Sequence, residues 1–212
     1  MASFLRRPLR YRSYNATIIL IVVNILVFLF SYYLDRQGVS EIFLLRPQDV
    51  FQNGDWWQVI TYMFFHAGWS HLFFNMLALF MFGIQLEQRM GSTEFLLYYF
   101  FSGIGAGIVT ALLFEAMGLG GVYVLGASGA IFAVLLAFAA FFPDARIFVL
   151  GILPVRAPTL VVVYSGIEIF SQLINPRSGV AHLAHLSGLA FGYLYLVVRY
   201  GMNPVAIFFK RR

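Results

Sequence analysis

Apolar residues form long runs along this chain, and polar residues are concentrated in the short segments between them. A helix needs about 20 mostly apolar residues to cross a lipid bilayer. Runs near that length predict six spans, at 16–33, 72–85 with its flanks, 95–117, 127–142, 157–174 and 181–200. The run 147–155 is too short and contains Pro154, so we expect a loop there. The pattern predicts an all-α, polytopic membrane protein.

Composition agrees with this prediction. The 212 residues are 61% hydrophobic and 11% charged, whereas a soluble domain carries about 25% charged residues. The absence of cysteine excludes disulfides, thiolate metal sites and cysteine nucleophiles. No small-residue cleavage site accompanies the first run, so we expect an uncleaved first helix. The length favours one six-helix domain at 16–200, with short basic segments at 1–15 and 201–212.

The basic residues predict the orientation in the membrane. Six spans put both termini on one side, and eleven of the 14 lysines and arginines lie on that side. We therefore expect both termini to be cytoplasmic, in a plasma or bacterial inner membrane. Because this distribution accounts for the net charge of +5, no nucleic-acid partner is implied. The loop 34–70 then lies outside, and its tryptophans Trp56 and Trp57 suit the headgroup layer, so part of it is expected in the interface.

Polar side chains from three predicted helices are placed at one depth, just below the outer surface. Ser128 opens the fourth span, His185 lies in the first turns of the sixth, and His71 and Asn75 open the second. Taken singly, Ser128 is more typical of helix packing and Asn75 of a structural hydrogen bond, whereas His185 is as typical of an interhelical hydrogen bond as of catalysis. Together they are the components of an acyl-transfer site, because a serine nucleophile needs a base and its oxyanion needs donors.

Each of these residues has a definite expected role. His185 would remove the Ser128 proton, since imidazole titrates near the working pH. His71 and Asn75 are four residues apart and share a helix face, so both can direct an N–H group at one oxyanion. The backbone N–H of Ser128 would supply a third donor. We expect the site to face the outer side, from which water enters.

Small residues are expected to bring these helices together. Gly188 and Gly192 are four residues apart on the sixth span and present one small face. Such a face lets two membrane helices approach closely. We expect it to press against the fourth span near Gly126 and Gly129, which would bring the histidine to the serine.

Two further features concern the catalytic base. Phe132 lies one turn after Ser128 and is expected to hold the His185 ring by stacking. Glu115 ends the third span and Glu168 lies within the fifth, and no motif places either behind the histidine. The sequence therefore predicts a Ser–His dyad without a third member.

The histidines also raise a metal-site alternative. His66 and His71 are five residues apart, and His182 and His185 are three apart. The sequence contains no HExxH motif, and no Asp or Glu lies within a turn of either pair on the predicted spans. We therefore expect no metal and no organic cofactor.

Between about 57 and 192 the sequence resembles the rhomboid family of intramembrane serine proteases. "GASG" at 126–129 is similar to the family's GxSG motif, which implies Ser128 as the nucleophile. "AHLSGLAFG" resembles AHxxGxxxG on the last core helix and implies His185 as the base. "HAGWSHLFFN" resembles HxxxxHxxxN and implies His71 and Asn75 as oxyanion-hole side chains.

A fourth similarity has a structural implication, and two positions depart from the family pattern. "LEQRMGS" resembles an ExR pattern and implies a surface pair of Glu87 and Arg89 with low direct energetic value. Many members have Trp-Arg in the first loop, where this chain has Trp57 followed by Gln58. The position of Phe132 is often tyrosine in the family.

The remaining two histidines are given supporting roles. His182 is a further histidine common in the last-helix motif, and we assign it to packing or hydrogen bonding near the site. His66 precedes the oxyanion helix and is expected to organise the first loop.

The resemblance implies an endopeptidase in the lipid bilayer that cleaves transmembrane segments of membrane proteins near the outer face. An alternative is a non-catalytic rhomboid-like protein that binds membrane clients, but such relatives typically lack the serine or the histidine. A small-solute transporter would need paired charges near the midplane or an inverted repeat, and we find neither in the sequence.

Overall fold

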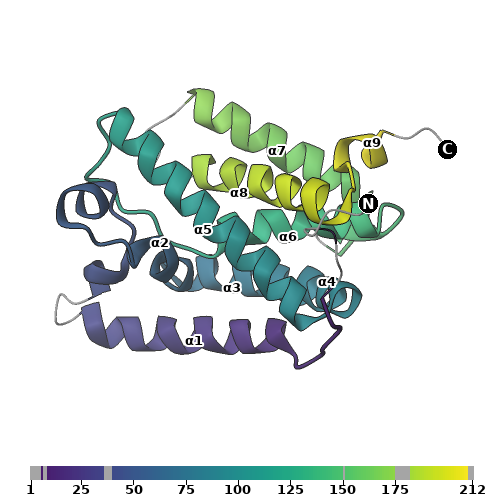
Figure 1. The fold of residues 1–212 in the computed structure, drawn as a ribbon, viewed down its shortest axis with the longest axis horizontal. Coiled ribbons are helices and arrows are strands. Elements are labelled where there is room, and N and C mark those ends of the chain that lie inside the picture. Colours follow the sequence, from purple (N-terminus) through teal and green to yellow (C-terminus); the bar gives the residue numbers. More distant parts are fainter. Residues whose placement is uncertain (1–5, 7–8, 36–39, 150, 175–181, 210–212) are drawn as a thin grey trace.

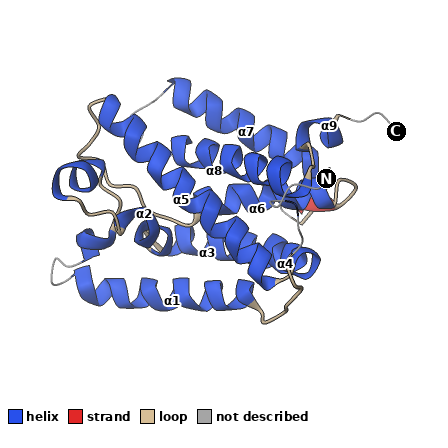
Figure 2. Cartoon of the chain, in the orientation of Figure 1, coloured by secondary structure: helices blue, strands red, loops and turns tan. Residues whose placement is uncertain are grey.

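The computed structural model describes residues 6, 9–35, 40–149, 151–174 and 182–209 (Figure 1). Its α-helices are α1 (Ala16–Asp35), α2 (Gln58–Thr61), α3 (Trp69–Ala78), α4 (Ile84–Met90), α5 (Ser92–Ala116), α6 (Ser128–Phe141), α7 (Ala157–Ile174), α8 (His182–Tyr195) and α9 (Pro204–Phe208). Short 3-10 or π-helical turns are η2 (Ser40–Phe43), η3 (Asp49–Asn53), η4 (Tyr62–Phe64), η5 (Leu79–Gly83) and η6 (Leu196–Tyr200). The chain is therefore mostly helical, as predicted (Figure 2).

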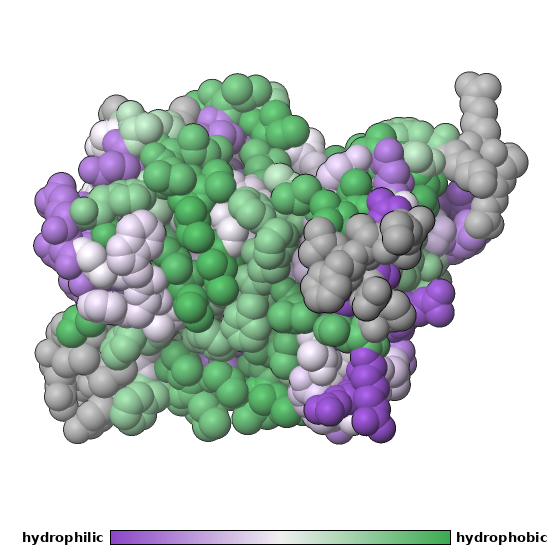
Figure 3. Space-filling model, in the orientation of Figure 1, coloured by the Kyte–Doolittle hydropathy of each residue, from purple (hydrophilic) through white to green (hydrophobic). Residues whose placement is uncertain are grey.

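Three of these helical segments are long and apolar enough to cross a membrane. They are Trp69–Met90, which joins α3, η5 and α4, then Ser92–Ala116 and Ala157–Ile174. Shorter apolar helices cover Ala16–Ser31 and Ser128–Phe141. Apolar side chains form a broad band across the middle of the molecule, and hydrophilic side chains gather toward its two ends (Figure 3). This distribution is that of a multi-pass membrane protein.

Helix α6 is the buried centre of the bundle, in contact with α5, α7 and α8. Its five alanines are all buried: Ala130, Ala133, Ala137, Ala139 and Ala140. Apolar lipid tails give no hydrophobic drive for helices to associate, so close packing of small residues has to supply the attraction. The alanine-rich surface of α6 meets that requirement.

The closest approach in the bundle joins α6 to α8. A Cβ atom added to Gly188 would lie 2.0 Å from the carbonyl oxygen of Gly129. One added to Gly192 would lie 2.8 Å from the Cβ of Ala133, one turn further along. The expectation that Gly188 and Gly192 let the sixth span press against the fourth is confirmed at Gly129. Gly126 contacts a different helix, described below.

The segment after α6 corrects a prediction. Instead of an irregular loop, residues 146–156 contain an antiparallel hairpin of β1 (Arg146–Val149) and β2 (Leu153–Arg156) (Figure 2). Pro154 pairs with Phe148 and does not prevent strand formation. A two-stranded ribbon has no inner strand, so a residue without an N–H group is tolerated there.

Within the described residues 40–68, the first loop contains several short helical turns. Trp57 is 45% exposed, and its indole N–H donates to the carbonyl of Ile42. Gln58 is fully buried, and its side-chain oxygen accepts from the backbone N–H of Arg46 at 2.9 Å. The residue that replaces the family's arginine thus ties the loop together through an uncharged amide.

The expected surface pair of Glu87 and Arg89 is wrong. Glu87 is buried and accepts from the backbone N–H groups of Ala16 and Thr17, at 2.7 and 2.8 Å, and from the hydroxyl of Ser92. It therefore satisfies the free donors at the start of α1, where a negative charge is favourable. The Arg89 guanidinium lies over the ring of Phe141 instead. Residues two apart point to different faces of a helix, which is why the two do not meet.

The close approach of α6 and α8 generates a stability prediction. Gly188→Ala places a methyl group against a backbone oxygen that cannot move independently, so the free energy of unfolding should fall by about 1–3 kcal/mol. Gly166→Ala on α7 is the matched control, because a Cβ there meets nothing within 4 Å. That variant should be as stable as the parent or slightly more stable. Unfolding in detergent micelles measures both, and equal losses would contradict the packing argument.

Candidate active site

Ser128 is placed by a tight turn that ends at the first residue of α6. Gly126 has φ +122°, a backbone conformation that L side chains rarely adopt, and its N–H donates to the carbonyl of Tyr62. A Cβ at this glycine would also lie 2.8 Å from the imidazole of His71. Both the turn and the neighbouring ring therefore require glycine in the GASG segment.

His185 on α8 reaches Ser128 across the close α6–α8 interface. Its Nε2 lies 2.7 Å from the serine Oγ, a hydrogen-bond distance. The ring of Phe132 stacks on the imidazole, with centroids 4.5 Å apart and an angle of 9° between the planes. The predicted Ser128–His185 contact and the predicted stacking are both present.

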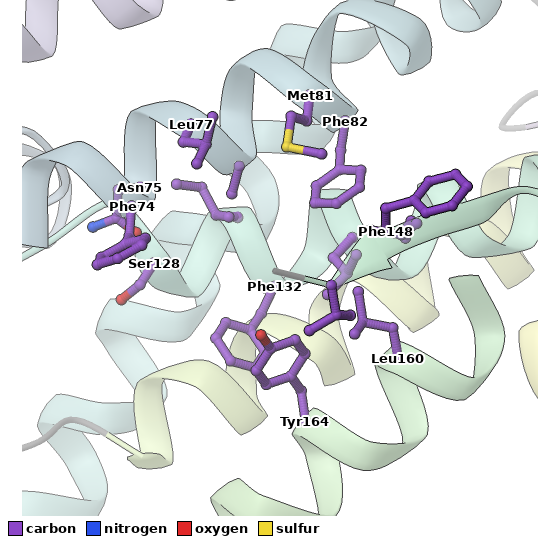
Figure 4. A pocket seen from close by; sticks show the side chains of 15 residues that line it. Phe74, Asn75, Leu77, Met81, Phe82, Ser128, Phe132, Phe148, Leu160 and Tyr164 are labelled. Atoms are coloured by element: carbon purple, nitrogen blue, oxygen red, sulfur yellow. The ribbon is translucent and has the colours of Figure 1, made fainter. Parts of the chain in front are cut away.

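Two side chains of α3 supply N–H groups beside the serine. Asn75 is buried, lines the same cavity as Ser128, and its Nδ2 has no hydrogen-bond partner among the described residues (Figure 4). The backbone N–H of Ala67 lies 3.4 Å from Nδ1 of His71 and donates to it. In a neutral ring the proton is then on Nε2, which faces Gly126. This arrangement suits a developing oxyanion.

The structure adds one residue that the sequence analysis did not assign to the site. Glu168 on α7 is buried, and its Oε1 lies 3.1 Å from Nδ1 of His185. Its Oε2 lies 2.5 Å from Nδ1 of His182, so His182 has the hydrogen bond near the site that was expected. The expectation that no carboxylate lies behind His185 is wrong. An acid inside an apolar span was the available signal, because such a group needs a partner.

The carboxylate of Glu168 adds an acid to the histidine pair on α8, which bears on the metal-site alternative. Ligand atoms of Glu168, His182 and His185 lie within 4.8 Å of one another. Each oxygen of the carboxylate already faces an imidazole nitrogen, so paired contacts account for the cluster. The absence of a metal stays a prediction, and a chelator experiment below tests it.

His66 lies in the loop before α3 and packs against His71 on that helix. It is buried, and its ring centroid is 5.0 Å from that of His71. Burial, together with the nearby His71, lowers the pKa of His66 to about 4. The ring is therefore neutral near pH 7, and so it adds no positive charge beside His71.

A cavity of about 420 Å³ extends from Ser128 along α6. Its walls come from α3, η5, α6, β1 and α7, and Figure 4 shows Phe74, Leu77 and Met81 on one side and Leu160 and Tyr164 on the other. Nearly all of the lining is apolar, with Ser128 and Asn75 as polar exceptions. The Ser128 hydroxyl thus lies beside a space suited to an apolar chain.

Comparison with known proteins agrees with this geometry. A family model, the rhomboid domain, matches residues 53–201. The putative rhomboid protease YdcA of Bacillus subtilis is 34% identical over 144 residues, which cover 67% of this chain and 66% of YdcA. The rhomboid protease AarA of Providencia stuartii is 36% identical over 100 residues, 45% of this chain and 36% of AarA.

A plant relative extends the comparison beyond bacteria. Rhomboid-like protein 11, chloroplastic, of Arabidopsis thaliana is 29% identical over 120 residues, 57% of this chain and 40% of that protein. The chain thus spans less than two thirds of each of these three relatives. The family model covers more than half of this chain and includes all four of its histidines and Ser128. The chain belongs to the rhomboid family of membrane proteins.

Proposed function

We propose that this protein is an intramembrane serine endopeptidase with Ser128 as its nucleophile and His185 as its base. The observation that carries the proposal is the 2.7 Å contact between the serine Oγ and Nε2 of the histidine. A serine hydroxyl is a weak nucleophile until such a base takes its proton. The family match and the relatives named as rhomboid proteases support the same activity.

The reaction follows from the positions of these groups. His185 takes the proton as Ser128 Oγ attacks the scissile carbonyl carbon, and the carbonyl oxygen becomes an oxyanion. His71 Nε2–H, Asn75 Nδ2–H and the backbone N–H of Ser128 donate to that oxygen. His185 then protonates the leaving amine, and the C–N bond breaks to give a serine ester. A water molecule, deprotonated by His185, then attacks the ester carbonyl carbon. The C–O bond to Ser128 breaks, His185 returns the proton to the serine oxygen, and the new carboxyl end of the substrate is released.

The proposed topology has six spans, cytoplasmic termini and a site near the outer face, in a plasma or bacterial inner membrane. The division into a membrane domain at 16–200 and short basic termini belongs to the same proposal. Its support is the charge distribution. The hairpin that contains Arg146 and Arg156 lies toward the end of the molecule that carries α4 and α9 (Figure 2). Arg199 lies in η6, a few residues before α9. Ser128 begins α6 at the opposite end of that helix from the hairpin.

The first test is labelling of the purified, detergent-solubilised protein by a fluorophosphonate probe. The parent should be labelled, and Ser128→Ala and His185→Ala should not, because the first lacks the nucleophile and the second its base. Labelling is read by in-gel fluorescence, with folding checked by thermal unfolding. A folded parent without labelling would contradict the proposal and favour a client-binding rhomboid-like protein.

The oxyanion role of Asn75 gives a separate prediction. Asn75→Ala should lower the maximal labelling rate by roughly 100- to 1000-fold, because it removes one donor to the developing negative charge. Asn24→Ala is the matched control: Asn24 is also buried, but its amide donates to Leu20 within α1. The control should be labelled at the parent rate. Similar losses in both variants would assign Asn75 to structure alone.

The cavity suggests the substrate class and its route. A helical substrate hides its peptide carbonyls in hydrogen bonds, so cleavage requires local unwinding. We propose a transmembrane segment with small or helix-weakening residues near its outer end. It would reach Ser128 sideways between the second and fifth spans, where side chains of α3 and α7 line opposite walls of the apolar cavity.

A crosslink tests this route. The natural chain has no cysteine, so Phe74→Cys and Tyr164→Cys can be joined selectively by a bis-maleimide. Cleavage of a transmembrane segment in liposomes should fall strongly after crosslinking, whereas the small fluorophosphonate should still label Ser128. The two single-cysteine variants, treated with the same reagent, are the controls. Undiminished cleavage by the crosslinked protein would exclude lateral access between these helices.

A further inference from the structure

The buried carboxylate of Glu168 connects the reactive histidine to a second histidine. Its Oε1 is 3.1 Å from Nδ1 of His185, and its Oε2 is 2.5 Å from Nδ1 of His182. Nε2 of His185 is in turn 2.7 Å from Ser128 Oγ. Carboxylate, imidazole and hydroxyl thus form a continuous chain from α7 through α8 to α6.

We propose that Glu168 is a positioning residue that fixes the tautomer and orientation of His185, so that the site operates as a Ser128–His185–Glu168 triad. This inference rests on the proposed protease function and replaces the dyad that the sequence predicts. Glu168 does not contact the scissile bond, and it acts through the imidazole.

The chemical reason is the asymmetry of the imidazole ring. His185 can accept the serine proton only if Nε2 is unprotonated, and a neutral ring then carries its proton on Nδ1. An ionised carboxylate only accepts hydrogen bonds, so Glu168 favours the tautomer with Nδ1–H. It also stabilises the imidazolium that forms when the serine proton is taken up. The proton stays on the imidazole and passes to the leaving amine, and Glu168 remains ionised.

The contact between Glu168 and His185 is close but is not an aligned hydrogen bond. Glu168 and His185 are at ion-pair distance, but Nδ1 is not aligned as a hydrogen-bond donor to the carboxylate. Catalytic hydrogen bonds often become aligned only when substrate is bound. Phe132 stacks on the flat face of the imidazole and so restricts rotation of the ring about its Cβ–Cγ bond.

Three ionisable groups among the described residues face the His185 imidazole. Among the described residues, Glu168 faces His185 from α7, His182 from its own helix, and His71 from α3. Glu168 is the acid in this group. A purely structural role for it would be to join α7 to α8 through His182, and the experiment has to separate that role from positioning.

The test compares Glu168→Gln, Glu168→Asp and the parent by the pH dependence of fluorophosphonate labelling. The Gln variant should reduce the maximal rate at least about 100-fold, with a smaller change in half-saturating probe concentration, because the wrong tautomer becomes populated. Its pH profile should also change, because the imidazole no longer faces a carboxylate. The Asp variant keeps the carboxylate, so it should restore part of the labelling rate and the pH profile of the parent.

Glu94→Gln is the matched control. Glu94 is likewise a buried carboxylate, but its partners are Arg199 and Tyr195. Its replacement should lower thermal stability and leave the pH profile of the folded fraction unchanged. Nitrogen-15 spectra of the four histidines supply an independent readout: the His185 ring, assigned with His185→Gln, should be protonated on Nδ1 in the parent and mixed in Glu168→Gln.

The outcomes separate this inference from the proposed function. A labelled parent with an unchanged rate and pH profile in Glu168→Gln would overturn the triad and leave the protease in place. A folded parent without labelling would overturn both. Loss of parent labelling in EDTA would show that the cluster holds a metal ion, which also overturns the positioning role. The positioning role would be supported if Glu168→Gln lowers the labelling rate and changes its pH profile, and if Glu168→Asp restores part of both. These effects should be the same with and without EDTA.

Discussion

The site depends on the close approach of α6 and α8 at Gly129 and Gly188. A membrane interior gives helices no hydrophobic reason to associate, so this interface forms through small residues that allow backbone contact. The same contact brings His185 to 2.7 Å from Ser128 and lets Phe132 stack on the imidazole. A methyl group added at Gly188 would push α6 and α8 apart, and with them Ser128 and His185.

A second constraint is the cost of placing charge inside an apolar bundle, and three carboxylates meet it differently. Glu87 accepts from the free backbone donors at the start of α1. Glu94 receives two hydrogen bonds from Arg199 and one from Tyr195. Both join segments far apart in the sequence. Glu168 instead faces two imidazoles, one of them the proposed base, which is why it alone suggests a role in the chemistry.

The cavity relates this polar site to its proposed substrate. Apolar walls from α3 and α7 suit a segment that leaves the lipid, and the Ser128 hydroxyl and the Asn75 amide line the same cavity. The proposed binding surface, which is apolar, and the proposed reacting groups, which are polar, thus occupy different parts of one cavity. The tight turn at Gly126 lies against His71, so it holds Ser128 close to a proposed oxyanion donor.

From the sequence alone, the apolar spans, the pairing of Ser128 with His185 and the stacking of Phe132 were predictable, because run length, local motifs and helical spacing specify them. The tertiary structure decided which groups meet across helices. Glu168 reaches His185 because α7 packs on α8, and no sequence spacing encodes that contact. Glu87 was expected at the surface beside Arg89, but it is a buried cap because α1 begins against it. Local patterns determine which face a residue occupies, and only packing determines what that face touches.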